Sequence, residues 1–295
     1  MTHPLRRAAR ALVCAVAAGV LLAPDPASAQ GGVTSPDLDD PCPAVYPGDS
    51  ASLERIARWM ARGAIDRGLP RELPVMAGLA ESGLRNLSGA DFDGYFGMHE
   101  SLNTGEYRGF PSRPTLQLAW FLDTAMSVRR HRLATGRPDP AADERAYGLW
   151  IADVERPAPE NRSGYQRYLP DAHRLLGERC PSPLVAEAGG PAVRLRIATR
   201  QAAGDGAVGL RVRCPETACL AGAVLTTRVA SRRRRARAAP IESQPGDWAS
   251  LSVRVPRAAL RQLAGGGSLS ARLTAIGVDA EAHAASVERR LVLTP

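Results

Sequence analysis

A short stretch rich in proline, glycine and alanine, at residues 181–191, divides this chain of 295 residues into two parts with different chemistry. Thirteen of the fourteen aromatic residues precede this stretch, and only Trp248 follows it. Residues 30–183 carry 18 arginines and 21 acidic side chains, whereas residues 184–295 carry 17 arginines and 8 acidic side chains. The division predicts two domains joined by a linker at 181–191.

The first 29 residues have the three regions of a secretory signal peptide. Arg6, Arg7 and Arg10 form its positive region, thirteen apolar residues follow at 11–23, and Ala27-Ser28-Ala29 is a small-residue cleavage pattern. Thirteen apolar residues are too few to span a bilayer comfortably. We therefore expect a secreted protein with no membrane anchor after signal cleavage.

Four cysteines remain once that segment is removed, and an even number in an oxidising compartment predicts disulfides. Of the three pairings, we favour a local Cys214–Cys219 link, because these two residues frame the hexapeptide CPETAC. This leaves a Cys42–Cys180 bridge around everything between them. Zinc is the rival interpretation, but no histidine lies near these cysteines at ligand spacing, so we expect no metal.

Residues 52–180 have the apolar spacing of helices, after an N-terminal segment at 30–51. Ser52 is a plausible N-cap for the first helix, and residues 86–111 predict a loop with a short hairpin at most. The helices are expected at 53–67, from 70 or 74 to 82, at 114–136, at 141–153 and at 163–178.

Residues 192–295 alternate with period two, which predicts an antiparallel β-sandwich of six short strands. The basic run RRRRAR at 232–237 could be the tip of a solvated hairpin, and 257–264 could form a helical turn. The pattern RVRCPETACLAG resembles bacterial immunoglobulin-like modules. The strands are expected at 193–199, 208–214, 223–229, 250–255, 268–278 and 286–293.

Glu81 is the principal candidate for catalysis, since the sequence contains no nucleophile elbow, zinc-protease motif or nucleotide-binding loop. It lies at the carboxyl end of an expected apolar helix, followed by Ser82 and by a polar loop that bears aromatic residues. A carboxyl group held against apolar walls can retain its proton near neutral pH and donate it to a leaving-group oxygen.

The runs ESGL at 81–84 and DFDGYFGM at 91–98 resemble the lysozyme-like soluble lytic transglycosylases, in particular a secreted actinobacterial branch. Further similarity lies at 105–111, 116–125, 150–157 and 165–169, so the resemblance covers about 45–180. It implies an α-rich lysozyme-like domain whose substrate is the glycan strand of peptidoglycan.

The resemblance also implies that Glu81 is the single acid and base. It would protonate the glycosidic oxygen between MurNAc and GlcNAc and then take the proton of the C6 hydroxyl, so that a 1,6-anhydro end forms without water. No cofactor is expected. Substrate contacts are expected from Ser82 and from a set of loop and helix residues, namely Asp93, Tyr95, Phe96, Met98, His99, Tyr107 and Trp150.

The family usually carries a glutamine after the Glu helix, where this chain has Gly97 or His99, depending on the alignment. Two alternatives therefore stay open. One is a hydrolytic lysozyme, with Asp91 or Asp93 as a second carboxylate. The other is a non-catalytic wall-binding protein on the same fold.

The basic charge of residues 184–295 favours anionic partners. Outside a cell these are anionic cell-wall polymers. Nucleic acid is not expected, because a region with one aromatic residue has no stacking platform for bases.

Overall fold

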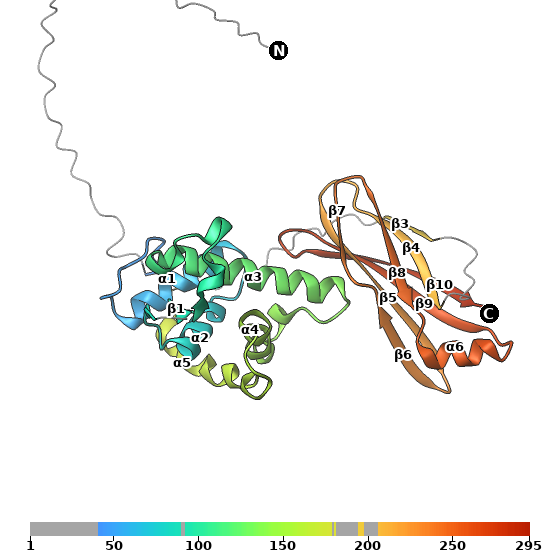
Figure 1. The fold of residues 1–295 in the computed structure, drawn as a ribbon, viewed down its shortest axis with the longest axis horizontal. Helices are drawn as coiled ribbons and strands as arrows, with labels where there is room; N and C mark the ends of the chain where they lie inside the picture. Colours follow the sequence, from blue (N-terminus) through green and yellow to red (C-terminus); the bar gives the residue numbers. More distant parts are fainter. Residues whose placement is uncertain (1–40, 90–91, 179, 181–193, 198–205) are drawn as a thin grey trace, which may run out of the picture. The chain divides into compact units, whose positions relative to one another are not determined.

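The computed structural model describes residues 41–89, 92–178, 180, 194–197 and 206–295 (Figure 1). The described chain is of mixed α+β class, with helices and one short hairpin up to Leu176, and antiparallel strands with one helix after it. The expected signal peptide, the linker at 181–191 and Asp91 lie outside the described residues. No helix in the described part combines the length and apolar character that crossing a bilayer requires.

The helices follow the expected order (Figure 1). Ser52 caps the first one, because its Oγ accepts a hydrogen bond from the Arg55 amide at 3.3 Å. The fourth helix begins later than expected, since residues 140–146 form two 3₁₀ turns before it. The α-helices are α1 (Leu53–Asp66), α2 (Glu72–Glu81), α3 (Pro114–Ala134), α4 (Tyr147–Glu155) and α5 (Leu169–Leu176).

Short 3₁₀ turns and one hairpin connect these helices. The hairpin pairs β1 (Phe92–Asp93) with β2 (Met98–His99), within the segment where a short hairpin was expected. The turns are η1 (Glu100–Leu102), η2 (Gly105–Tyr107), η3 (Phe110–Ser112), η4 (Pro140–Ala142), η5 (Glu144–Ala146), η6 (Pro159–Asn161) and η7 (Gly164–Tyr168).

One apolar core joins the helices α1 to α5. Met60 from α1, Met76 from α2, Phe121 from α3 and Trp150 from α4 are buried in it. The Cys42–Cys180 disulfide is present, as predicted, and links the segment before α1 to the segment after α5. The chain that forms this core is therefore tied together near both of its ends.

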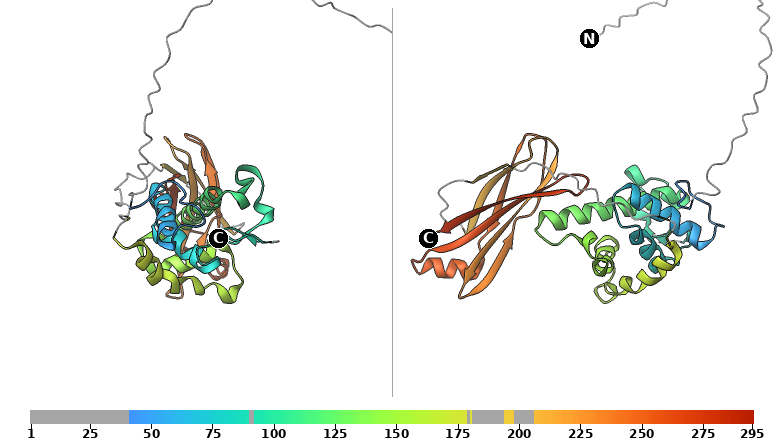
Figure 2. Two further views of the ribbon diagram at one scale, coloured as in Figure 1. Left: turned by 90° about the vertical axis from the view of Figure 1, so that its left-hand side faces the viewer. Right: turned by 180° about the vertical axis from the view of Figure 1, so that it is seen from behind.

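Residues 194–197 and 206–293 form two antiparallel sheets with a shared core, a β-sandwich-like arrangement (Figures 1 and 2). The smaller sheet has the order β3 (Arg194–Ile197), β4 (Ala207–Arg213), β8 (Trp248–Arg254). The larger has the order β10 (Ala284–Leu293), β9 (Leu269–Val278), β5 (Cys219–Val229), β6 (Arg232–Arg237), with β7 (Ile241–Ser243) also paired to β5. The helix α6 (Arg257–Ala264) follows β8, where a helical turn was expected.

The described residues of this part contain eight strands rather than the six expected. The hypothesis that 232–237 is the tip of a hairpin is wrong. These residues are strand β6, and the turn before them consists of Ala230 and Ser231, which both have positive φ. Period-two patterning missed β6 because four successive arginines show no alternation. The Cys214–Cys219 disulfide is present, as predicted.

The end of α3 contacts the outer face of the larger sheet through a third, smaller apolar cluster. Ala134 packs with Val224 and Ile276. A Cβ at Gly222 would lie 1.9 Å from the Ala134 carbonyl oxygen, so this close approach requires glycine. Backbone carbonyl groups at the contact accept hydrogen bonds from arginine.

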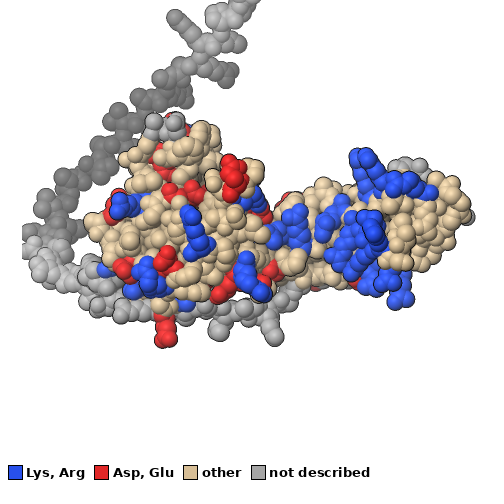
Figure 3. Space-filling model, turned by 90° about the horizontal axis from the view of Figure 1, so that it is seen from below, with Lys and Arg blue, Asp and Glu red and all other residues tan. Residues whose placement is uncertain are grey.

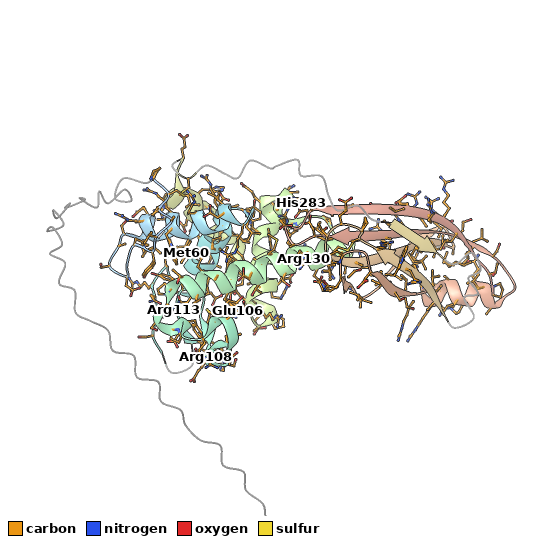
Figure 4. The ribbon with its side chains drawn as sticks, turned by 90° about the horizontal axis from the view of Figure 1, so that it is seen from above. Met60, Glu106, Arg108, Arg113, Arg130 and His283 are labelled. Carbon is orange, nitrogen blue, oxygen red and sulfur yellow. A yellow bond between two sulfur atoms is a disulfide. The ribbon has the colours of Figure 1, made fainter. Side chains whose placement is uncertain are left out.

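Two such bonds are present. The Arg237 side chain donates to the Thr135 carbonyl at 2.7 Å, and the Arg130 side chain donates to the Asp279 carbonyl at 2.8 Å. Arg130 also lies 3.2 Å from Glu242, and His283 lies 3.0 Å from the Asp279 carboxylate (Figure 4).

The two disulfides close loops of very different length, so they should stabilise the folded protein to different degrees. The first joins residues 138 positions apart and the second residues 5 apart. In the chain-entropy description, a closed loop of the first length stabilises by about 4–5 kcal/mol and one of the second length by about 2 kcal/mol. We expect Cys42→Ser/Cys180→Ser to lower the free energy of unfolding by clearly more than Cys214→Ser/Cys219→Ser does, in urea unfolding followed by fluorescence. Equal losses would show that loop closure does not set the stability of the helical part.

Candidate functional site

Glu81 is the last residue of α2, and the chain turns back sharply after it. Gly83 and Leu84 both adopt positive φ, and the Leu84 amide donates to the Gly78 carbonyl at 3.0 Å. This bond closes the helix in the manner of a Schellman motif, with Leu84 buried against Gly78. The turn leaves the Glu81 side chain half-buried at the helix end, where the apolar core meets the loop that follows.

The segment Gly94–Met98 is fixed to this helix end by two polar side chains. The Ser82 hydroxyl lies 2.9 Å from both the Gly78 and the Tyr95 carbonyl oxygens. The Gln117 amide, fully buried on α3, accepts from the Tyr95 amide at 3.0 Å. Because these groups satisfy buried backbone donors and acceptors, the position of the segment is closely determined.

Gln117 also binds the two ends of the surrounding loop. Its Nε2 donates to Asn86 Oδ1 at 3.1 Å and to the Phe110 carbonyl at 3.0 Å. A Cβ at Gly94 would lie 2.4 Å from the Gln117 carboxamide, so only glycine allows the backbone to pass so close. The buried Gln117 carboxamide therefore binds loop residues that lie up to 31 positions before it in the sequence.

This anchoring brings the backbone of Gly97 onto the Glu81 carboxylate. A Cβ built on Gly97 would lie 3.4 Å from Glu81 Oε2 and 4.0 Å from Glu81 Cβ. Gly97 has a φ of 56°, in the left-handed region that favours glycine. It is also one of the two positions at which the family glutamine was expected. The residue at this position therefore decides how closely the loop approaches the carboxylate.

The other oxygen of Glu81 is held by a tyrosine. The Tyr165 hydroxyl, from η7, donates to Glu81 Oε1 at 2.5 Å. Burial, and then the hydrogen bond to Glu81, raise the pKa of the Tyr165 phenol, so it remains a neutral donor. Tyr165 therefore fixes the orientation of the carboxylate and leaves Oε2 for another partner.

A second glutamate lies behind this pair. Glu155 is the last residue of α4, and its Oε1 is buried with no hydrogen-bond partner. Burial, and then the negative charge of Glu81, raise the pKa of the Glu155 carboxyl well above its ordinary value. Two carboxyl groups with different environments thus lie at one site, and the buried one holds its proton more tightly than an exposed glutamate does.

The aromatic residues that the sequence placed along a sugar groove are in the core instead. Tyr95, Phe96 and Trp150 are at most 1% exposed, and so is Met98. Phe96 stacks on Phe121 with ring centroids 4.7 Å apart, and the Trp150 indole donates to a backbone carbonyl of α3. A ring covered on both faces cannot stack on a sugar, so these side chains position the loop and do not line its surface.

The remaining expected residues lie at the surface in local contacts. Asp93 accepts from the Gly89 amide, and His99 accepts from the Ser101 amide, so both stabilise turns. Tyr107 is half-buried and donates to Asp123 at 3.1 Å. Of this group, His99 alone is paired with an exposed aromatic ring. Phe92, which is 59% exposed, meets it edge to face across the β1–β2 hairpin with centroids 5.6 Å apart.

Sequence reasoning missed Tyr165, Glu155 and Gln117 as parts of this site. Tyr165 and Glu155 lie within segments 165–169 and 150–157, which carried similarity to the transglycosylases, but nothing local marks either as a neighbour of Glu81. Gln117 follows Leu116 within an apolar helix, and a polar residue among buried neighbours is the one signal that could have singled it out.

One group of the described residues has the spacing of metal ligands, and it lies outside this site. The side chains of Asp279, Glu281 and His283 place ligand atoms within 4.8 Å of one another. Asp279 and His283 are already hydrogen-bonded to each other at 3.0 Å, which accounts for their closeness without an ion. We therefore assign no metal to this group.

Comparison with known proteins does not assign the chain to a family. No protein-family model and no curated protein matches it. Among solved structures it is similar to the sporulation control protein Spo0M of Bacillus subtilis, with 14% sequence identity and a TM-score of 0.23. That match covers 37% of this chain and 51% of Spo0M, so the aligned part spans about half the length of the Bacillus protein. A TM-score this low carries no argument about fold or function.

The buried carboxyl of Glu155 predicts a pH-dependent stability. Below the ordinary glutamate pKa both the folded and unfolded states hold the proton. As the pH rises toward the folded-state pKa, only the unfolded state releases it, so stability is lost. Glu155→Gln mimics the protonated form. We expect its free energy of unfolding to exceed that of the wild type by a margin that widens with pH, by up to about 1.4 kcal/mol per pH unit.

Urea unfolding between pH 5 and pH 8 measures this margin. The matched control is Glu160→Gln, an exposed residue of η6, whose difference from the wild type should stay constant over the same range. A margin for Glu155→Gln that does not change with pH would show that Glu155 is ionised in the folded protein.

Proposed function

We propose that the mature chain is a secreted lytic transglycosylase that cleaves the β-1,4 bond between MurNAc and GlcNAc in peptidoglycan. Its helical part is a lysozyme-like domain, and Glu81 is both acid and base. One observation carries the proposal: the Glu81 carboxylate lies at a helix end between the Tyr165 hydroxyl and the backbone of Gly97. That placement orients a single carboxyl group beside a loop that can bind a sugar.

The reaction needs one proton to move twice. Glu81 first donates a proton to the glycosidic oxygen, and the bond to the MurNAc C1 breaks, so GlcNAc leaves with a free C4 hydroxyl. The carboxylate then takes the proton of the MurNAc C6 hydroxyl. The C6 oxygen bonds to C1, which gives a 1,6-anhydro end and returns Glu81 to its protonated form. Tyr165 holds Oε1 throughout, so Oε2 is the oxygen that exchanges the proton.

The surroundings of Glu81 favour this route over hydrolysis through a second carboxylate. A retaining glycosidase needs another ionised carboxylate about 5 Å from the acid. Burial of its carboxyl and the charge of Glu81 raise the pKa of Glu155, which disfavours its ionised form, and Asp93 accepts a hydrogen bond from the Gly89 amide. Asp91 lies outside the described residues. Attack by the substrate's own C6 hydroxyl is the route that requires no second carboxylate.

The substrate contacts in this proposal differ from those that the resemblance implies. The exposed Phe92 and His99 rings offer the stacking surface, because Tyr95, Phe96 and Trp150 are buried. Ser82 acts on the Tyr95 carbonyl and so positions the loop. Gly97, without a side chain, leaves its backbone amide and carbonyl beside Glu81, where they can bind polar groups of the sugar.

The rest of the chain fits a protein that acts outside the cell. Two disulfides are consistent with an oxidising compartment. The sandwich formed by strands β3 to β10 would be an immunoglobulin-like module that holds the enzyme at the wall. A carboxyl group and a shaped surface suffice for glycosidic chemistry, so the proposal requires no cofactor.

The experiment uses residues 30–295 and purified peptidoglycan, with soluble muropeptides identified by mass spectrometry. The wild type should release anhydro-muropeptides. Glu81→Gln should reduce their release by at least about 100-fold, because a general acid contributes about 10²–10⁴ to the rate. Glu160→Gln is the matched control and should retain wild-type activity.

Other products would overturn the proposal in defined ways. Reducing ends heavier by one water would identify a hydrolase, and Asp91 and Asp93 would be the next residues to change. Full binding to the wall by the wild type, with no release of fragments, would identify a non-catalytic wall-binding protein.

A further inference from the structure

A basic hollow opens on the outer face of the larger sheet, at the end of that face away from the apolar cluster with α3. Its volume is about 630 Å³, and its lining comes from strands β5, β6, β9 and β10. Four arginines line it: Arg228, Arg233, Arg272 and Arg290. Arginine side chains also gather over the β-rich part on the face seen in Figure 3, whereas basic and acidic side chains alternate over the helical part.

The four arginines form two pairs of like charge directly across neighbouring strands. Arg272 of β9 pairs in register with Arg290 of β10, and Arg228 of β5 pairs in register with Arg233 of β6. Like charges directly opposite each other in a sheet are destabilising. Two such pairs facing one hollow are a cost to the fold that a bound anion would remove.

The charges are also largely unneutralised by the protein. Among the described residues, Arg272 alone of the four has an acidic partner, Glu288 at 3.1 Å, and both of those side chains are about half exposed. An exposed pair of this kind contributes little. The other three arginines are exposed and form no salt bridge within the described chain. Arginine's planar fork binds phosphate oxygens in a bidentate manner, so phosphate groups are the chemistry that this hollow fits best.

The spacing of the arginines suits a chain of phosphates better than a single phosphate. The four arginines lie on four neighbouring strands of the sheet. Because neighbouring strands are about 4.8 Å apart, the outermost two of these strands are about 14 Å apart. The rest of the lining consists of small or aliphatic side chains, such as Thr226, Ser270 and Val292, with no aromatic ring. Trp248, the one aromatic residue of this part, lies on the other sheet, with the Arg211 guanidinium over its ring. A nucleic acid would find no platform for its bases here.

We propose that this hollow is a binding site for a linear polyol phosphate, an anionic wall polymer whose backbone phosphodiesters carry no bases. The arginines contact successive phosphates, and the threonine and serine hydroxyls bind the polyol groups between them. The site is independent of Glu81, so it holds whether or not the chain cleaves glycan. It would retain the protein at the wall surface.

The test measures binding of a fluorescent poly(glycerol phosphate) chain to residues 30–295 by anisotropy, at several salt concentrations. The variant Arg228→Gln/Arg272→Gln/Arg290→Gln should lose at least about tenfold in affinity. Its plot of log affinity against log salt should be flatter by about 2, since each lost phosphate contact removes about 0.7 from the slope of a single-stranded polyanion. The free energy of unfolding of this variant should be no lower than that of the wild type, because both pairs of like charge are removed.

The matched control is Arg254→Gln/Arg257→Gln/Arg261→Gln, which removes the same charge from β8 and α6. It should change the affinity by less than about twofold if the hollow, and not net charge, is what binds. Equal losses in the two triple variants would overturn the proposal, as would the absence of binding by the wild type. Equal or tighter binding of a single-stranded DNA with the same number of phosphates would also overturn it, in favour of a nucleic-acid site.

Discussion

The hydrogen bonds of one buried side-chain amide, that of Gln117, hold the candidate site of this protein together. Gln117 lies on the longest helix of the described chain and binds backbone or side-chain groups on both sides of the loop after α2. Without it, the Tyr95 amide and the Phe110 carbonyl would be buried and unpaired, and each unpaired group costs about 1–3 kcal/mol. The loop therefore has one stable position, and that position puts Gly97 beside Glu81.

Two glutamates in unequal surroundings follow from this arrangement. Each is the last residue of its helix, Glu81 of α2 and Glu155 of α4, and η7 brings Tyr165 to the first of them. Burial, and then the negative charge of Glu81, raise the pKa of the Glu155 carboxyl well above its ordinary value, so the two glutamates differ in how readily they release a proton. The proposed chemistry depends on this difference, because one carboxyl must exchange a proton while the other keeps its own.

Local patterns in the sequence predicted much of the fold. The Ser52 cap, the apolar spacing of the helices and the cysteine spacing predicted α1, α3 and both disulfides. Strand β6 could not be predicted in this way, because RRRRAR has no alternation and its strand conformation comes from pairing with β5. Tertiary pairing outweighed local pattern there.

Only those site residues that are marked by their immediate sequence neighbours could be predicted. Glu81 could be singled out from the helix end on which it lies. Tyr165 could not be placed beside it, since 84 positions separate the two and only the packing of η7 against α2 brings them together. The exposure of the aromatic residues could not be predicted from the sequence either, because Phe92 and Phe96 are the same residue type in one short hairpin, yet Phe92 is exposed and Phe96 is buried.

The central claim is that a glycan binds where Gly97 meets Glu81. The most direct measurement is an amide NMR titration of the Glu81→Gln protein with a tetrasaccharide of two GlcNAc–MurNAc repeats. The account predicts chemical-shift changes at residues 92–99 and around residue 81, with none in strands β4 to β10. Changes confined to the strands, or none at a saturating concentration of the sugar, would contradict it.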